Sequence, residues 1–277
     1  MLDGSFWETT QYLLSVDFVQ VTLVASALLG ILSGVMAPLI VLRQMSFSVH
    51  ATSELALMGA SAALLFGLNV GLGAIAGAIV AALTLAALGF RGQQDSAVGV
   101  VMSFGMGLSV LFIHLYPGNA NRALSLLTGQ IVGVSSSNVW LLAATTVVVV
   151  AAVAVLWRPM LFASADPIMA AASGVNVRAM ALVFAVLVGI ASAQSVQIVG
   201  ALLVMSLMIT PGAAAASITA NPVRAVLYSV VFAEVAAVGG LILSLAPGVP
   251  VSVFVAFISF GIYLVCRVIG SLQRRRI

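Results

Sequence analysis

The sequence predicts an all-α membrane protein, a polytopic bundle of eight or nine transmembrane helices. Of its 277 residues, 63% are hydrophobic and only 6% are charged, whereas about 25% of the residues of a typical soluble domain are charged. The mean hydropathy is +1.27. Apolar segments of roughly 20 residues, long enough to cross a bilayer, follow one another along the chain. We expect a single transmembrane domain over residues 1–277 that is located in the plasma or inner membrane.

Nine segments meet the length and composition of a membrane span. The Gly-rich segments and the segment 197–219 meet it least well, because Pro211-Gly212 interrupts the latter. The predicted spans are 18–42, 48–67, 70–90, 97–116, 138–157, 178–195, 197–219, 223–246 and 251–268.

The arginines predict the orientation of these spans, since cytoplasmic loops carry an excess of basic residues. All ten basic residues are arginines. With Arg274–Arg276 in the cytoplasm, the nine spans leave only Arg122 outside, together with the acidic N-terminus. The basic net charge therefore indicates membrane orientation and gives no support to nucleic-acid binding. Six further arginines fall on the cytoplasmic side: Arg43, Arg91, Arg158, Arg178, Arg224 and Arg267.

His50 and Glu54 are the candidate metal ligands. Their i, i+4 spacing puts both side chains on one face of the predicted helix 48–67. Ionisable groups are costly inside a membrane, so they usually face a cavity, a pore or a partner. An imidazole and a carboxylate supply half of a divalent-metal site. The alternative is a structural His–Glu hydrogen bond that holds adjacent helices together.

Other polar residues are weaker candidates. Glu234 lies in the middle of the predicted span 223–246, where it could line a transport pathway, pair with an imidazole, or stay protonated. Gln194 and Gln197 fall at a tight external turn and are expected to be solvated. The single cysteine, Cys266, excludes an internal disulfide and a cysteine-based metal cluster.

Two connections are longer than the rest. Residues 117–137 are expected outside the cell. Residues 158–177 are expected in the cytoplasm and contain helix-boundary signals: Asp166 as N-cap, Pro167 at the first helical position, and Gly174 as a stop about two turns later. Such a short helix either lies at the membrane interface or docks on a soluble partner.

Several separated stretches resemble one family, the integral-membrane permeases of ABC transporters that import zinc, manganese or ferrous iron. Their order and spacing cover nearly the whole chain. The stretches are VLRQMSFSVHATSELALMGASAALLFG at 41–67, DSAVGVVMSFGMGLSVLFI at 95–113, LLTGQIVGVSSSNVWLL at 126–142, ADPIMAAASGVNV at 165–177, IVGALLVMSLMITPGAAAASIT at 198–219 and PGVPVSVFVAFISFGIYLV at 247–265.

The resemblance implies a permease of the vitamin B12 and metal-chelate importer type, and not an enzyme. In the family the second membrane segment usually carries an aspartate and, four residues later, a histidine. Here His50 and Glu54 keep one imidazole and one carboxylate in the opposite order, which leaves the identity of the metal open. The resemblance also implies that 165–177 is a coupling helix that contacts the ATPase, with Asp166, Pro167, Ala170 and Gly174 as its residues.

The implied assembly is a homodimer of the chain with two separate ATPase subunits and an extracytoplasmic metal-binding protein that docks near 117–137. The chain has no P-loop pattern with which to hydrolyse ATP itself. It is expected to hold no permanent cofactor and to carry zinc or manganese, or ferrous iron, as cargo. Its rivals are a proton-coupled secondary metal transporter with Glu234 and the His50–Glu54 pair as proton carriers, an intramembrane metallohydrolase with His50 and Glu54 as ligands, and a purely structural membrane scaffold.

Overall fold

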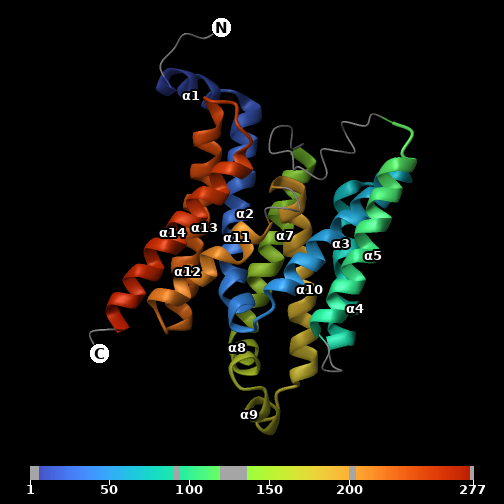
Figure 1. The fold of residues 1–277 in the computed structure, drawn as a ribbon, viewed down its shortest axis with the longest axis vertical. Helices are drawn as coiled ribbons and strands as arrows, with labels where there is room; N and C mark the ends of the chain where they lie inside the picture. Colours follow the sequence, from blue (N-terminus) through green and yellow to red (C-terminus); the bar gives the residue numbers. More distant parts are fainter. Residues whose placement is uncertain (1–5, 90–93, 119–135, 200–203, 275–277) are drawn as a thin grey trace. The chain divides into compact units, whose positions relative to one another are not determined.

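A computed structural model describes residues 6–89, 94–118, 136–199 and 204–274, and every regular element in these ranges is an α-helix (Figure 1). The external connection predicted at 117–137 falls almost entirely outside these ranges. The helices are α1 (Phe6–Leu14), α2 (Asp17–Leu42), α3 (Ser46–Leu65), α4 (Val70–Gly89), α5 (Gln94–Leu115), α7 (Ser136–Val155), α8 (Trp157–Ala165), α9 (Pro167–Ala172), α10 (Val177–Val199), α11 (Val204–Met208), α12 (Thr210–Ile218), α13 (Pro222–Leu245) and α14 (Val251–Arg274).

Eight of the nine predicted spans correspond to one helix each. The prediction of a single helix over 197–219 is wrong. The first residues of that segment extend α10 to Val199, and its described part from Val204 onward contains the short helices α11 and α12. Ile209 separates these two helices, and Pro211 stands in the first turn of α12. Proline has no amide hydrogen and its ring clashes with the preceding turn, so it begins a helix there and does not continue one.

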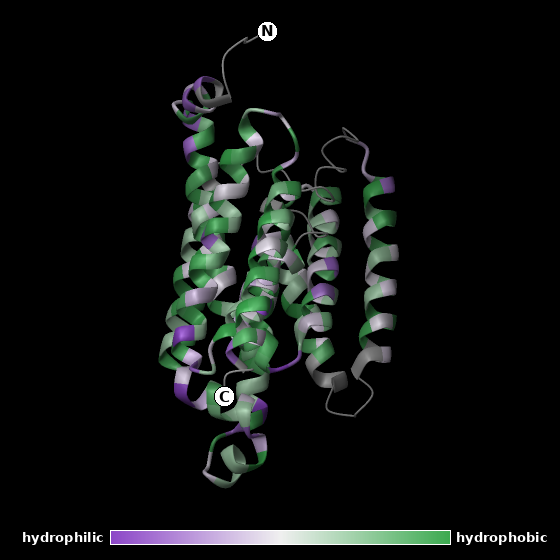
Figure 2. Ribbon diagram, turned by 60° about the vertical axis from the view of Figure 1, so that its left-hand side comes forward, coloured by the Kyte–Doolittle hydropathy of each residue, from purple (hydrophilic) through white to green (hydrophobic). Residues whose placement is uncertain are grey.

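Six described helices are long and apolar enough to cross a membrane: 17–42, 98–115, 138–155, 177–196, 222–245 and 251–273. Shorter apolar stretches occupy 70–85 and 204–218. Figure 2 shows hydrophobic residues running along the long helices. α3 has 20 residues but is less apolar, because His50, Glu54 and several hydroxyl residues lower its hydropathy. The helices indicate a multi-pass membrane protein.

The contacts of the chain gather into two compact units. One unit comprises 1–38, 130–146 and 205–277, and the other comprises 39–129 and 147–204. We call them the α13 unit and the α3 unit after the helices that carry Glu234 and the His50–Glu54 pair. A single domain over 1–277 stays a prediction.

Within the α3 unit, α3 packs against α4, α5 and α10. Glycines form the close contact between α3 and α4. A Cβ atom on Gly59 would meet the backbone oxygen of Gly73 and lie 2.8 Å from the Cα atom of Gly77. Small residues four apart let two helix backbones come this close inside a membrane. Because α4 is so near, the middle of α3 is covered by protein.

Within the α13 unit, α13 packs against α14 and α12, and α2 meets α13 through two glycines. A Cβ atom on Gly34 would lie 2.5 Å from the Cα atom of Val230, and one on Gly30 would lie 2.7 Å from the Oε1 atom of Glu234. Glu234 therefore has its place beside α2 only because residue 30 has no side chain.

Gly59→Ala tests the close contact between α3 and α4. We expect a lower thermal unfolding temperature of the detergent-purified protein, because the added methyl group overlaps backbone atoms, and overpacking of this kind typically costs about 1–3 kcal/mol. Gly107→Ala on α5 is the matched control, since a Cβ there meets nothing within 4 Å and alanine favours helix. Equal stability of the two variants would contradict the contact.

Candidate metal site

The candidate site begins at a tight corner between α2 and α3. Leu42 ends α2 and Ser46 starts α3, so only three residues turn the chain. Gln44 adopts a left-handed backbone conformation with φ +54°. The amide of Met45 donates to the carbonyl of Ile40 over 3.1 Å, which closes the end of α2. This corner determines where the first turns of α3 lie within the unit.

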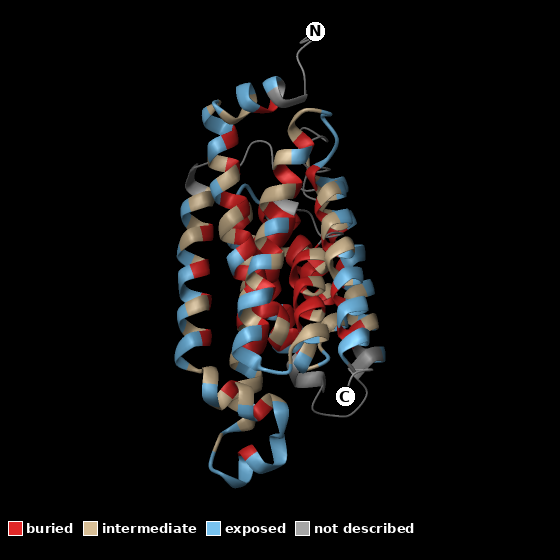
Figure 3. Cartoon of the chain, turned by 90° about the vertical axis from the view of Figure 1, so that its left-hand side faces the viewer, coloured by how far each residue is buried: buried red, intermediate tan, exposed pale blue. Residues whose placement is uncertain are grey.

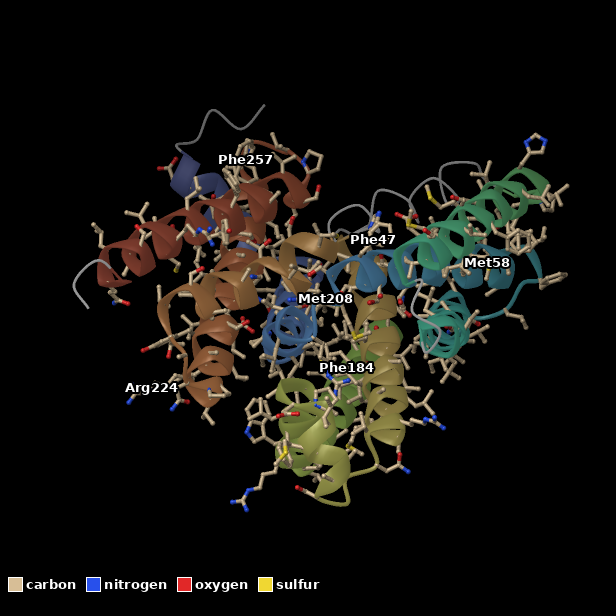
Figure 4. All side chains as sticks on the ribbon, turned by 60° about the horizontal axis from the view of Figure 1, so that its bottom comes forward. Phe47, Met58, Phe184, Met208, Arg224 and Phe257 are labelled. Atoms are coloured by element: carbon tan, nitrogen blue, oxygen red, sulfur yellow. The ribbon has the colours of Figure 1, made fainter. Side chains whose placement is uncertain are left out.

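The middle of α3 is buried on all sides. Every residue from Ala51 to Leu57 is buried, and Glu54 is only 4% exposed. The outer parts of the helix differ, since Phe47 near its start is 41% exposed. Figure 4 labels Phe47 and Met58 on this helix. A charged residue in a stretch that is buried all round is unusual unless it has a partner or a function.

The hydroxyl groups of this stretch are used by the helix itself. Thr52 donates to the carbonyl of Ser48 over 2.7 Å, and Ser53 donates to the carbonyl of His50 over 2.7 Å. The Nδ1 atom of His50 is buried, yet within the described ranges it has no hydrogen-bond partner. The imidazole lies close enough to Glu54 to interact with it electrostatically. The Nδ1 atom of His50 is thus left without a partner, beside the buried carboxylate of Glu54.

This arrangement places an imidazole and a carboxylate, two groups of the kind that bind divalent metals, on one helix face. Zinc sites usually have four ligands, and manganese sites have more. Among the residues that the structure describes, no group of three or more His, Cys, Asp or Glu side chains could hold a metal. One described chain therefore supplies an incomplete site. The unpartnered Nδ1 atom also fails to support the alternative of a structural His–Glu hydrogen bond made through that atom.

Glu234 lies in the α13 unit and is not part of the pair on α3. Its carboxyl is partly buried, and its Oε1 atom has no hydrogen-bond partner in the described part of the chain. The backbone amide of Ile31 on α2 lies within its reach. A role of Glu234 in a transport pathway stays a prediction.

The residues predicted to couple to an ATPase form a short capped helix. The Asp166 carboxylate accepts a hydrogen bond from the amide of Met169 over 2.9 Å, and Pro167 starts α9. Gly174 has φ +87°, a left-handed conformation that favours glycine, and it follows the end of α9 by two residues. Ala170 is fully buried. The predicted boundary signals thus occupy the positions expected of them.

The outer surface of α9 is apolar and open. Ile168 is 81% exposed and Met169 is 56% exposed. Figure 3 shows that most of the α8–α9 segment is exposed. Large apolar side chains exposed this far are typical of surfaces that contact something else.

Gln194 is a buried polar residue, contrary to the prediction from the sequence. It was expected in a solvated external turn, whereas α10 continues past it and leaves it 2% exposed. Its Nε2 atom has no hydrogen-bond partner among the described residues. The side chain of Gln197 lies outside the described part. A longer predicted helix would have placed Gln194 inside the unit, but its position at the end of the predicted span 178–195 gave no signal for the continuation.

The ABC 3 transport family matches residues 15–270. The chain belongs to this family. The sequence resemblance to ABC permeases is thereby confirmed. The manganese transport system membrane protein MntC of Listeria innocua is 32% identical over 260 residues, which cover 90% of this chain and 91% of the relative. The high-affinity zinc uptake system membrane protein ZnuB of Haemophilus influenzae is 24% identical over 219 residues, which cover 77% and 84%.

A solved structure of the PsaBC complex from Streptococcus pneumoniae with a Fab has the same fold as this member of the ABC 3 transport family. The TM-score is 0.86 with 23% identity, and the match covers 95% of each chain. The all-α architecture of a membrane permease is thus confirmed, and the family is one of transport proteins and not of enzymes.

Gly30→Ala tests the placement of Glu234 against α2. We expect a lower unfolding temperature, because the new methyl group displaces the carboxyl, and adding Glu234→Ala should recover part of the loss. Contacting residues of this kind couple by about 0.5–3 kcal/mol in a double-mutant cycle. Gly34→Ala is the matched control, because its methyl group meets the backbone of Val230, which the change at Glu234 does not relieve. Strictly additive effects of Gly30→Ala and Glu234→Ala would show that the two residues do not touch.

Proposed function

We propose that this protein is the permease subunit of an ATP-driven importer of a divalent transition metal, manganese or zinc, with ferrous iron as a third possible cargo. The observation that carries the proposal is the His50–Glu54 pair on α3, in which Glu54 is buried and the partly buried His50 has a ring nitrogen, Nδ1, without a partner among the described residues. Membership of the ABC 3 transport family and the manganese and zinc transport proteins among its relatives support the same function.

The metal is bound by two copies of the chain. Each copy offers one imidazole and one carboxylate, so a two-fold homodimer would present two nitrogens and two carboxylates. Such a set suits tetrahedral zinc, or manganese with added water. A site that is complete only between two copies, and that lies on a transport route, needs to bind weakly enough to release its ion. Glu234 is a candidate to line the same route.

The remaining parts of the importer are separate proteins. An extracytoplasmic protein delivers the metal, and cytoplasmic ATPase subunits bind α9 and its surroundings. The chain crosses the membrane eight or nine times, with its C-terminus in the cytoplasm and its N-terminus outside. The exposed apolar residues of α9 support the contact with the ATPase, and the arginine distribution supports the orientation.

The double substitution His50→Ala and Glu54→Ala is expected to abolish metal uptake, because it removes both ligands from every copy. The measurement is uptake of manganese, zinc and iron by liposomes that contain the permease, its ATPase and its binding protein, with and without internal ATP. Glu8→Ala on α1 is the control and should import normally. Normal uptake by the double variant would remove the site from the proposal.

The same liposomes distinguish ATP-driven import from proton-coupled transport. Accumulation that requires internal ATP supports the importer. Accumulation driven by a proton gradient in the absence of the ATPase would contradict it and would favour the secondary transporter, with Glu234 as the first residue to substitute.

Ile168→Asp is expected to release the ATPase from the permease, because it puts a charge in the centre of an apolar contact. Removing a central apolar anchor from an interface typically weakens binding by about 2 kcal/mol or more. The measurement is co-purification of the two subunits from detergent. Ile168→Leu keeps the apolar surface and should bind normally. Undiminished co-purification of Ile168→Asp would exclude α9 from the interface.

A further inference from the structure

Arg43 is a partly buried cation at the corner between α2 and α3. The Nε atom of its guanidinium donates to the Oγ atom of Ser164 on α8 over 2.6 Å, and Nη2 lies 3.4 Å from the carbonyl oxygen of Met160. Ser164 in turn donates to the same carbonyl. One side chain thus connects the corner to two successive turns of α8.

The guanidinium also stacks on α10. Its Cζ atom lies 4.4 Å from the centre of the Phe184 ring, and Figure 4 labels Phe184 on that helix. Phe184 is fully buried, as is Met160. Planar stacking on an aromatic ring combined with directed N–H donation is specific to arginine, because lysine has a compact ammonium group without a flat face.

The charge of Arg43 has no carboxylate partner among the described residues. Burial lowers the pKa of the guanidinium to about 10, so the group still carries its charge at neutral pH. A hydroxyl, a carbonyl and an aromatic ring are its surroundings. Even partial burial of a charge without a counter-ion carries a desolvation cost, and a plain structural contact between helices does not require a charge.

The position of Arg43 in the chain indicates what the contact is for. Ser164 is separated by one residue from Asp166, the N-cap of α9. Met45 and Ser46, which start α3, follow Arg43 almost directly, and His50 lies one helical turn further on. The guanidinium is therefore a short connection between the segment proposed to bind the ATPase and the helix proposed to bind the metal.

We infer that Arg43 is a positioning residue that transmits displacement of the α8–α9 segment to α3, and so couples ATP hydrolysis to movement of the His50–Glu54 pair. This inference rests on the proposed function. Transmission of the displacement requires both the N–H donors of the Arg43 guanidinium and its contact with the Phe184 ring. A positive charge alone provides neither of these.

The test is metal accumulated per ATP hydrolysed, measured in liposomes that contain the ATPase and the binding protein. For Arg43→Gln and Arg43→Lys we expect ATP hydrolysis close to the wild-type rate, while metal accumulated per ATP falls by about tenfold, within the usual range of allosteric coupling. Arg224→Gln is the control, because Arg224 is an exposed arginine at the start of α13 and lies outside the segment proposed to bind the ATPase. It should couple normally.

Ser164→Ala is the second variant, and it keeps the cation while removing its nearest acceptor. We expect metal accumulated per ATP to fall by about fivefold, with an unfolding temperature close to that of the wild type. If the Arg43 variants fail to assemble, Ser164→Ala decides the question. Unchanged coupling in Ser164→Ala would overturn the inference.

Other outcomes distinguish coupling by Arg43 from an effect of charge alone and from a purely structural contact. Full coupling in Arg43→Lys would show that the charge alone suffices and would overturn the inference. Parallel loss of hydrolysis, transport and thermal stability in all variants would do the same, because a purely structural contact predicts that pattern. Absence of ATP-dependent uptake by the wild-type liposomes would instead refute the proposed function itself.

Discussion

The close backbone contact between α3 and α4 is the constraint on which the α3 unit depends. Gly59 meets Gly73 and Gly77 with no side chain between the two backbones. This approach, together with the packing of α5 and α10, surrounds a helix that is too polar to face lipid alone. A carboxylate in hydrocarbon is destabilising by several kcal/mol, so the protein around α3 is what makes Glu54 tolerable. The same kind of backbone contact, Gly34 against Val230, serves the other unit.

Much of the fold could be predicted because the hydropathy of a segment depends only on the residues of that segment. Long apolar segments had to become helices, since lipid offers no partner for a backbone amide. The boundary signals around α9 were equally local: Asp166, Pro167 and Gly174 act on residues within a turn or two. Family resemblance then supplied the importer class. The His50–Glu54 pair followed from a simple spacing rule, and in the structure both residues lie on one helix, Glu54 buried and His50 partly buried.

The features that the sequence did not reveal depend on residues far apart in the chain. Arg43 and Ser164 are separated by 121 positions, and no pattern around either residue indicates the other. The sequence predicts Gln194 near a turn, whereas in the structure α10 continues to Val199. Pro211 marked 197–219 as an uncertain span but did not predict the break at Ile209. A proline can also be accommodated inside a membrane helix, as Pro38 is within α2.

The left-handed conformation of Gln44 has a mechanical consequence. Glycine adopts such a backbone conformation without strain, but it also allows a wide range of neighbouring angles. A side chain at this position narrows that range, so the corner between α2 and α3 resists bending more than a glycine turn would. α3 is therefore expected to move together with the end of α2 as one rigid body. Such stiffness allows a small displacement at one end of a helix to reach a side chain several residues away.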